Sequence, residues 1–463
     1  MPTDSGTRDT VTAGAESCDT HGHDQRQTVY LEVSSNKARR NSIQWREPPS
    51  ELVTPTGSLI VVVLNGVNGI LGAGVLSLPY AFSKCGLILG IVCLSFVTAV
   101  VSVTSTYLVD AARVHAVSTP NTGARAFPSY SDIARRTLGP FGAVVAPIAA
   151  FLFSYGGMVS YHVLLTKSWQ ALLLAWTGQR FSSFSVSIVI GVLLLLFSAR
   201  KDIGSIAKLS STNTVLTYLV CAFIVIRPLC GHFTDLSFRA VPLFPTKPAE
   251  VAIGVGLMSN AVVFHNFVLP LLRTIPPHKR SYANMRRVCL SVAIAVGALD
   301  MVLGFSGLLS FGLDVSDFVF DNFVSDPFTQ VMQSLFAVTL VLSYAMLAVA
   351  CRRLLFDTSE SVTGNKVLCT RWWQHVLLPT LAIVCVSTLV AALEIQLNTV
   401  QSLCGSLAGS LVAFILPCVI FLKQRTWRHS RSQSSRFSPL FASLAAGFGV
   451  LSACAGVYAT FIR

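Results

Sequence analysis

Long apolar runs follow one another along almost the whole chain, from about residue 57 to residue 461. Most of them have about 20 residues or more, and a helix needs about 20 apolar residues to cross the ~30 Å hydrocarbon core of a bilayer. Hydrophobic residues make up 52% of the chain, which exceeds the apolar share of soluble domains, and charged residues make up only 12%. The runs lack the alternation of apolar and polar residues typical of membrane strands. The sequence therefore predicts an all-α polytopic membrane protein.

The apolar runs predict about eleven transmembrane helices, separated by short polar or basic loops. The expected spans lie near residues 57–80, 86–112, 142–173, 182–200, 208–226, 250–271, 286–312, 327–352, 371–393, 398–423 and 437–461.

Basic residues are concentrated in alternate loops of this arrangement. If the N-terminus is cytosolic, the N-terminal tail and the cytosolic loops contain most of the 34 Lys and Arg residues, and the acidic segment GLDVSDFVFDNFVSDP lies outside. This asymmetry is typical of membrane proteins, whose cytosolic loops carry an excess of Lys and Arg. The asymmetry also accounts for the net charge of +13 without a nucleic-acid partner. The plasma membrane is the expected location, and an endolysosomal or vacuolar membrane is the alternative.

Residues 1–54 are polar and rich in Ser, Thr and charged residues. Such a composition buries too little apolar surface to fold, so this N-tail is predicted to be a disordered cytosolic extension of a transmembrane domain formed by residues 55–463. The N-tail has no apolar signal-peptide core, so the first span is expected to act as the insertion signal. Among the 12 cysteines, Cys85 and Cys230 both fall outside and are a candidate pair. Most of the others lie in spans, where a buried apolar role is the simpler interpretation.

The first span contains residues that weaken a helix. The segment NGVNGILGAGVLSLPYAF, residues 65–82, carries several glycines and the amide of Asn68 near mid-membrane. Glycines in membrane helices often serve close packing, which is one interpretation. An interrupted helix is the other, because freed carbonyls coordinate a cation and the freed N–H groups of Gly72, Ala73 and Gly74 hold a substrate carboxylate.

The sixth span shows a corresponding interruption, five spans later. Its stretch VAIGVGLMSNAVVFHNFVLP, residues 251–270, combines glycines, Ser259, Asn260, His265 and a proline. Corresponding breaks in two halves of a chain point to a binding site near the bilayer midplane, between inverted repeats. We therefore predict an inverted five-helix repeat with broken helices 1 and 6. Ser259 and Asn260 are further substrate-binding candidates.

Four segments resemble the sodium-coupled neutral amino acid transporters, within the amino acid/auxin permease superfamily. NGVNGILGAGVLSLPYAF is similar to the first-helix signature of that family, and FHNFVLPLLRTIPPHKRSYANMRR resembles its histidine-containing segment and the basic loop after helix six. GFSGLLSF and VLSYAMLAVACRR are similar to parts of its helices seven and eight. The resemblance covers roughly residues 57–425 and implies transport of amino acids.

The resemblance also implies roles for individual residues. Asn68 and Ser343 fall where the family has sodium-linked side chains, and oxygen ligands suit a hard cation such as sodium. Thr339, one helical turn before Ser343, is a further candidate ligand. A hydrogen bond from Ser343 to its own helix is the competing interpretation. Asn266 stands where the family usually has proline and Asn260 where it usually has an aromatic residue, which leaves the substrate side chain open.

Two ionisable groups are candidate proton sites. His265 matches the family histidine, although a lone histidine near a membrane boundary more often has a structural, hydrogen-bonding role. Asp300 lies between apolar residues at membrane depth, where an unpaired charge is costly, and it is not part of the family pattern. Lys167, near the outer end of the third span, is expected to snorkel to the membrane surface.

These features predict a secondary active transporter of L-amino acids, neutral ones above all, that works by alternating access and is coupled to sodium or protons. A membrane amino-acid sensor that signals through the N-tail is the alternative. An enzyme is not expected, because the sequence has no HExxH or GxSxG motif. A channel would need rings of like charge or a repeated filter loop. The expected partners are the amino acid and the lipid bilayer. No cofactor is expected besides the coupling ion, and no oligomeric state is predicted.

Overall fold

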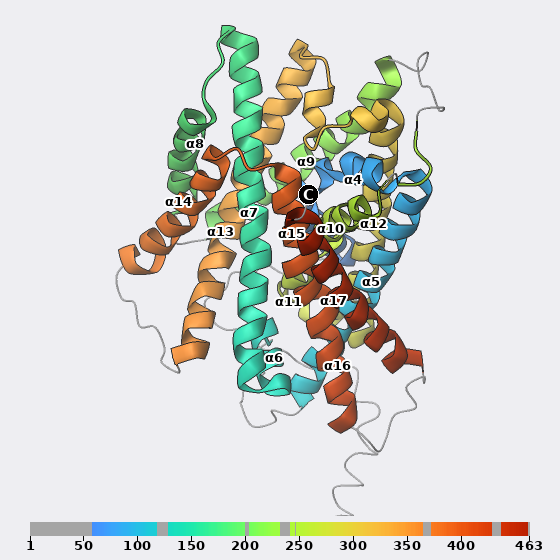
Figure 1. Ribbon diagram of the computed structural model, residues 1–463. Coiled ribbons are helices and arrows are strands. Elements are labelled where there is room, and N and C mark those ends of the chain that lie inside the picture. Colours follow the sequence, from blue (N-terminus) through green and yellow to red (C-terminus); the bar gives the residue numbers. More distant parts are fainter. Residues whose placement is uncertain are drawn as a thin grey trace, which may run out of the picture. The chain divides into compact units, whose positions relative to one another are not determined.

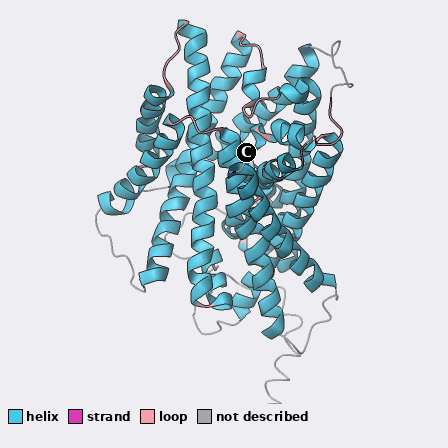
Figure 2. Cartoon of the chain, in the orientation of Figure 1, coloured by secondary structure: helices cyan, strands magenta, loops and turns pink. Residues whose placement is uncertain are grey.

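The computed structural model describes residues 58–117, 128–199, 203–231, 241–245, 247–363, 372–427 and 437–461. All of them belong to one compact unit, Gln44–Arg463. Helices form nearly all of the described residues, which contain no strand (Figure 1, Figure 2). The predicted N-tail and the side chain of Cys230 lie outside them, and Cys85 is a buried, free thiol. The prediction of an all-α membrane protein is confirmed.

The α-helices follow one another along the chain with the bounds α2 (Leu59–Ile70), α3 (Ala73–Leu76), α4 (Leu78–Cys85), α5 (Leu87–Val117), α6 (Tyr130–Leu138), α7 (Pro140–Thr177), α8 (Ser183–Ser198), α9 (Ile203–Gly231), α10 (Pro248–Val262), α11 (His265–Arg273), α12 (Tyr282–Phe311), α13 (Pro327–Thr363), α14 (Leu378–Ala392), α15 (Leu397–Leu403), α16 (Leu416–Trp427) and α17 (Phe437–Phe461). Short 3-10 helices are η3 (Pro277–Lys279), η4 (Gly312–Asp314) and η5 (Val319–Asn322). Two segments are π-helices, η6 (Trp373–Leu377) and η7 (Cys404–Ile415).

Each predicted span corresponds to a helix or to consecutive helices of the structure. Eight stretches in the described part are long and apolar enough to cross a membrane, and three shorter apolar helices, Leu59–Ile70, Ser183–Ser198 and Asn213–Arg227, lie at the remaining predicted spans. The sequence analysis did not predict α6, which begins at a capping box formed by Ser129 and Asp132. α6 has only nine residues, too few to cross a membrane, so it does not form a long apolar run in the sequence.

The first and sixth spans are both interrupted, as predicted. α2 ends at Ile70, and the backbone is extended at Leu71 (φ −62°, ψ 103°) and non-helical at Gly72 (φ −147°, ψ −145°). α10 ends at Val262, and Val263 is extended (φ −71°, ψ 122°) before α11 begins. Both interruptions leave backbone N–H and C=O groups without helical partners. In the hydrocarbon region such groups are tolerated only where protein covers them or a cavity lies beside them.

Glycines allow the interrupted spans to pack closely on their neighbours. A Cβ on Gly74 would lie 2.9 Å from the Cα of Ala261 in α10, and a Cβ on Gly66 would lie 2.8 Å from a methyl group of Val292 in α12. Real Cβ atoms essentially never approach other atoms so closely. Both interpretations of the glycines therefore apply, at different positions, because Gly66 and Gly74 serve packing and Gly72 lies at the break.

The two ends of the chain are expected on opposite sides of the membrane. Eleven spans are an odd number, and the distribution of Lys and Arg places Met1 in the cytosol, so Arg463 should face the other side. Tags at both ends, probed before and after stepwise permeabilisation of the membranes, measure this. Tags that become accessible under the same condition would contradict the topology.

Candidate functional site

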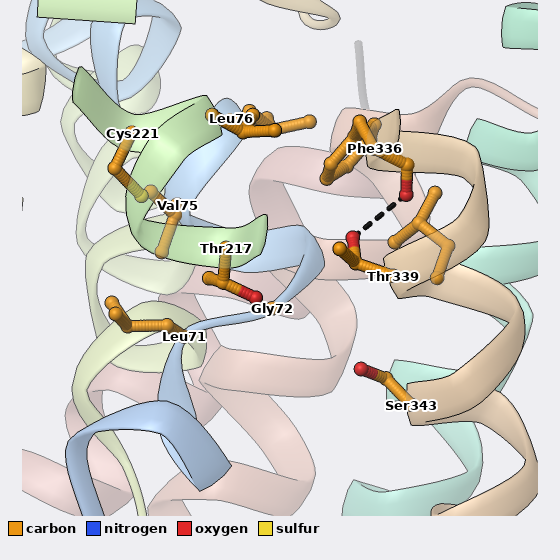
Figure 3. Close-up of a pocket in the computed structure, with 11 residues that line it drawn as sticks. Leu71, Gly72, Val75, Leu76, Thr217, Cys221, Phe336, Thr339 and Ser343 are labelled. Atoms are coloured by element: carbon orange, nitrogen blue, oxygen red, sulfur yellow. Dashed lines mark hydrogen bonds between the residues drawn. The ribbon is translucent and has the colours of Figure 1, made fainter. Parts of the chain in front are cut away.

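A small cavity lies beside the interruption of the first span (Figure 3). Its volume of about 20 Å³ holds a water molecule or a small ion, since one water needs about 10–15 Å³ by the same measure. An amino acid is too large for it in this conformation. The lining comes from the break and from the helices α9 and α13, and includes Leu71, Gly72, Thr217, Cys221, Thr339 and Ser343.

Hydroxyl groups from two helices face this cavity. The side chains of Thr217, on α9, and Ser343, on α13, point into the space between the two helices (Figure 3). Thr339 donates a hydrogen bond of 2.7 Å to the carbonyl oxygen of Phe336 in its own helix. Ser343 instead accepts a hydrogen bond of 3.3 Å from the Asn213 amide of α9. None of the hydrogen bonds described for Ser343 goes to its own helix, so the competing interpretation of this residue has no support in the structure.

The break in the first span also contacts Tyr161 of α7. A Cβ on Gly72 would overlap the hydroxyl oxygen of Tyr161, so the approach requires glycine. The oxygen of the same hydroxyl accepts a hydrogen bond from the backbone N–H of Ala73, and Tyr161 is buried. The half-helix that begins after Gly72 is longer than α3 itself, because Ser77, between α3 and α4, has helical dihedral angles (φ −93°, ψ 0°). A hydrogen-bond donor therefore lies beside the N–H groups at the start of a half-helix, an arrangement that suits a carboxylate.

Gln401 of α15 also contacts this half-helix. Its Nε2 donates to the carbonyl oxygen of Ala73 at 2.9 Å, and the Ser77 hydroxyl donates to its Oε1. Gln401 and Ser77 are both fully buried. The sequence analysis missed Tyr161 and Gln401. Their only signal in the sequence is a polar group inside an apolar run, which many structural residues share.

Asn68 lies in the last turn of α2, one turn before the break. Its side chain is buried, and its Oδ1 has no hydrogen-bond partner among the described residues. Asn68 does not line the cavity itself. A buried carbonyl oxygen without a partner costs about 1–3 kcal/mol, and such an oxygen is a suitable cation ligand. Its role as a sodium ligand stays a prediction.

Asp300 is fully buried on α12. Neither of its carboxylate oxygens has a hydrogen-bond partner in the part of the chain that the structure describes. Gly297 and Gly304, about one turn to either side, approach α5 and α4, so Asp300 lies on the face of α12 that packs against these helices. α12 also packs on α9, the helix that contributes Cys221 to the cavity wall. An unpartnered carboxylate at this depth remains a functional candidate.

His265 is the first residue of α11 and is fully buried. Its Nε2 lies 3.0 Å from Oγ1 of Thr104 in α5, whereas its Nδ1 has no partner among the described residues. His265 does not line the cavity. The contact with Thr104 favours the structural interpretation of this histidine, because it joins α11 to α5.

The two substrate candidates of the sixth span lie near the end of α10. Ser259 is fully buried, and its hydroxyl has no partner among the described residues. Asn260 packs against η7, where a Cβ on Gly405 would lie 2.6 Å from the Asn260 backbone nitrogen. Neither residue lines the cavity. Of the predicted site residues, the structure brings three to the cavity, namely Gly72, Thr339 and Ser343.

Polar contacts join α4, α7, α15 and the segment between α12 and α13 on the predicted outer side of the site. Asn398 of α15 donates from its amide to the Tyr80 hydroxyl of α4 at 2.9 Å, and from its backbone N–H to Asp317 at 3.3 Å. Lys167 of α7 forms an ion pair of 2.8 Å with Asp317, and the adjacent Phe318 is fully buried. Lys167 was expected to snorkel. Its ammonium group pairs with Asp317 of the segment between α12 and α13, which lies beside the end of α7.

Comparison with known proteins identifies related sequences. A family model described as "Transmembrane amino acid transporter protein" matches residues 55–462. The chain is 26% identical over 369 residues to "Putative sodium-coupled neutral amino acid transporter 11" of Bos taurus, a match that covers 78% of this chain and 75% of that protein. It is 26% identical over 380 residues to "Solute carrier family 38 member 10" of Mus musculus, covering 78% of this chain and 33% of that protein.

Two solved structures are similar to this one. The Eremococcus coleocola manganese transporter superposes with a TM-score of 0.54 at 14% identity, over 92% of this chain and 90% of that chain. Mhp1 in its inward facing conformation superposes with a TM-score of 0.56 at 13% identity, over 91% and 93% of the two chains. These likenesses show the fold alone, and they confirm the predicted architecture.

Among the described residues, no three His, Cys, Asp or Glu side chains are grouped so that they could hold a metal ion.

Proposed function

The chain belongs to the transmembrane amino acid transporter family, and from this premise we propose that it moves L-amino acids, neutral ones above all, across a membrane by alternating access. Such transport requires a binding site near the bilayer midplane that opens to each side in turn. Two interrupted spans that pack against each other support a site of this kind.

The observation that carries the proposal is the start of the half-helix at Gly72 and Ala73, together with the Tyr161 hydroxyl. N–H groups at a helix start attract an anion, and a hydroxyl donor beside them adds a further hydrogen bond to it. The substrate carboxylate is therefore expected here. The present cavity is too small for an amino acid, so its walls must separate when substrate enters. The contacts among Tyr80, Asn398 and Asp317 fit a conformation that is closed towards the outside.

Sodium is the coupling ion that we favour. The cavity offers the hydroxyl oxygens of Thr339 and Ser343, and Asn68, one turn from the break, brings a carbonyl oxygen that has no partner in the described part of the chain. Hard monovalent cations bind such neutral oxygen ligands. The names of the relatives in Bos taurus and other species, which refer to sodium-coupled transport of neutral amino acids, agree with this choice.

Proton coupling is the second candidate, and a separate observation favours it. Asp300 is fully buried, its two carboxylate oxygens have no partner among the described residues, and its helix α12 packs on α9, which lines the cavity. A carboxyl group in such surroundings is able to take up and release a proton as its exposure to water changes. His265 is the other candidate proton site, but its contact with Thr104 supports a structural role.

The plasma membrane is the proposed location, and an endolysosomal or vacuolar membrane is the alternative. If amino acid binds without being transported, the protein is instead a sensor that signals through residues 1–54.

Uptake by the purified, full-length protein in vesicles tests the function. A panel of radiolabelled amino acids is measured in sodium and in choline medium, each at two pH values. We expect sodium-dependent uptake of neutral L-amino acids. Amino acid esters and amides should compete poorly, because they lack the carboxylate. Specific binding of an amino acid without flux under every condition would reject the transporter and support the sensor.

A further inference from the structure

Asn213 of α9 is a polar residue that the sequence analysis did not identify. Only 4% of its surface is exposed, and its amide nitrogen donates to Oγ of Ser343 at 3.3 Å. Its carbonyl oxygen, Oδ1, is buried and has no hydrogen-bond partner among the described residues. A buried amide oxygen that receives no hydrogen bond is a suitable ligand for a cation.

Asn213 does not itself line the cavity, but it forms hydrogen bonds with two residues that do. Thr217 follows one turn later on α9, lines the cavity, and donates its hydroxyl hydrogen to the Asn213 carbonyl oxygen of the main chain at 2.8 Å. The Thr217 hydroxyl oxygen is therefore free to accept a cation. Ser343, the partner of the Asn213 amide, also lines the cavity.

A second unpartnered amide oxygen lies on the neighbouring element. Asn68 is one turn before the break in α2, α2 packs on α9, and Oδ1 of Asn68 is also buried without a partner in the described part of the chain. Two packed helices next to the cavity thus each carry a buried amide oxygen without a partner among the described residues.

We propose that Asn213 and Thr217 of α9 complete a site for one monovalent cation, which they share with Asn68, Thr339 and Ser343. The proposal rests on cation-coupled transport as the function, and it adds a third element to the site. The ligands are hydroxyl and amide oxygens, and no carboxylate lines the cavity. Divalent cations usually require carboxylate ligands, so sodium fits this set better than calcium or magnesium. The volume of about 20 Å³ also suits one ion.

The site explains how ion and substrate are coupled. Asn213 already joins α9 to α13 through Ser343. A cation that also binds Asn68 connects α2 to both helices, one turn from the N–H groups of Gly72 and Ala73. Binding of the ion therefore stabilises the broken conformation of the first span, in which the carboxylate site exists.

Thermal unfolding of the purified, full-length protein tests the site without requiring transport. The unfolding midpoint is measured in increasing sodium chloride, with choline chloride holding the ionic strength constant. A bound ion stabilises the folded state, so the wild-type midpoint should rise by about 2 °C or more at saturating sodium. Asn213→Leu should raise the half-saturating sodium concentration about tenfold or more, whereas Asn213→Asp should keep the sodium response because it retains the acceptor oxygen.

The two Asn213 variants separate a ligand from a structural residue. Loss of the sodium response in Asn213→Asp as well as in Asn213→Leu would overturn the proposal, because Asp retains an acceptor oxygen at this position. A normal sodium response in Asn213→Leu would overturn it too.

A pair of threonine variants supplies a matched control. The Thr388 hydroxyl of α14 donates to the carbonyl oxygen of Val384, four residues earlier, at 2.8 Å, as Thr217 does with Asn213. Thr217→Val should weaken the sodium response and Thr388→Val should preserve it, whereas equal responses would argue against Thr217 as a ligand. If wild-type uptake depends on sodium and the Asn213 variants respond normally, only this inference fails. If neither wild-type uptake nor wild-type unfolding responds to sodium, sodium coupling fails together with it.

Discussion

Substitution of Gly72 by valine is expected to abolish amino acid uptake while the protein still reaches the membrane. A Cβ at this position overlaps the Tyr161 hydroxyl, and the branched side chain fills the space in which the carboxylate meets the backbone N–H groups. A displacement of about 1 Å at a binding centre costs roughly a hundredfold in rate, so uptake should fall to the background. Uptake and membrane abundance are measured on the same cells. Gly74→Val should also abolish uptake, because it separates α3 from Ala261.

Two variants show whether the effect of Gly72 is local. Gly69→Ala is the matched control, since no atom lies within 4 Å of a Cβ at Gly69, and it should transport almost normally. Tyr161→Phe in a Gly72→Ala background removes the overlapping hydroxyl. Recovery of uptake in this double variant would mean that the Tyr161 hydroxyl is not needed for the carboxylate. Methyl esters that inhibit as well as free amino acids would reject the carboxylate site itself.

The second large effect concerns the coupling ion. Asn68→Ala and Ser343→Ala are each expected to raise the sodium concentration for half-maximal uptake by about tenfold, or ~1.4 kcal/mol, because each removes one oxygen ligand. Asp300→Asn should leave the sodium response in place. Uptake at a series of sodium concentrations and at two pH values measures all three variants.

Proton coupling predicts the reverse pattern for the same variants. Uptake would persist in choline medium, rise as the external pH falls, and collapse in Asp300→Asn. Uptake that ignores both ions and all three substitutions would indicate a facilitator or exchanger, and the cation site would then be rejected.

The interruptions of the spans could be predicted because their causes are local. Asn68 and the glycines up to Gly74 weaken a helix wherever they occur, and the stretch from Gly254 to Pro270 does the same in the sixth span. The π-helix η7 could not be predicted. It packs on α10 so closely that a Cβ on Gly405 would overlap the Gly256 carbonyl oxygen, and this contact exists only after the helices have assembled.

The amino-acid sequence by itself determined the spans, the positions of the two breaks and the family. The physical reason is that a bilayer requires long apolar helices with satisfied backbone groups, which is a rule about neighbours in the chain. Only the tertiary structure decided which polar groups meet at the break. Tyr161, Gln401 and Asn213 come from three separate helices, and their approach depends on the rotation and spacing of those helices. Close packing at glycines sets that spacing, and no local pattern in the sequence specifies it.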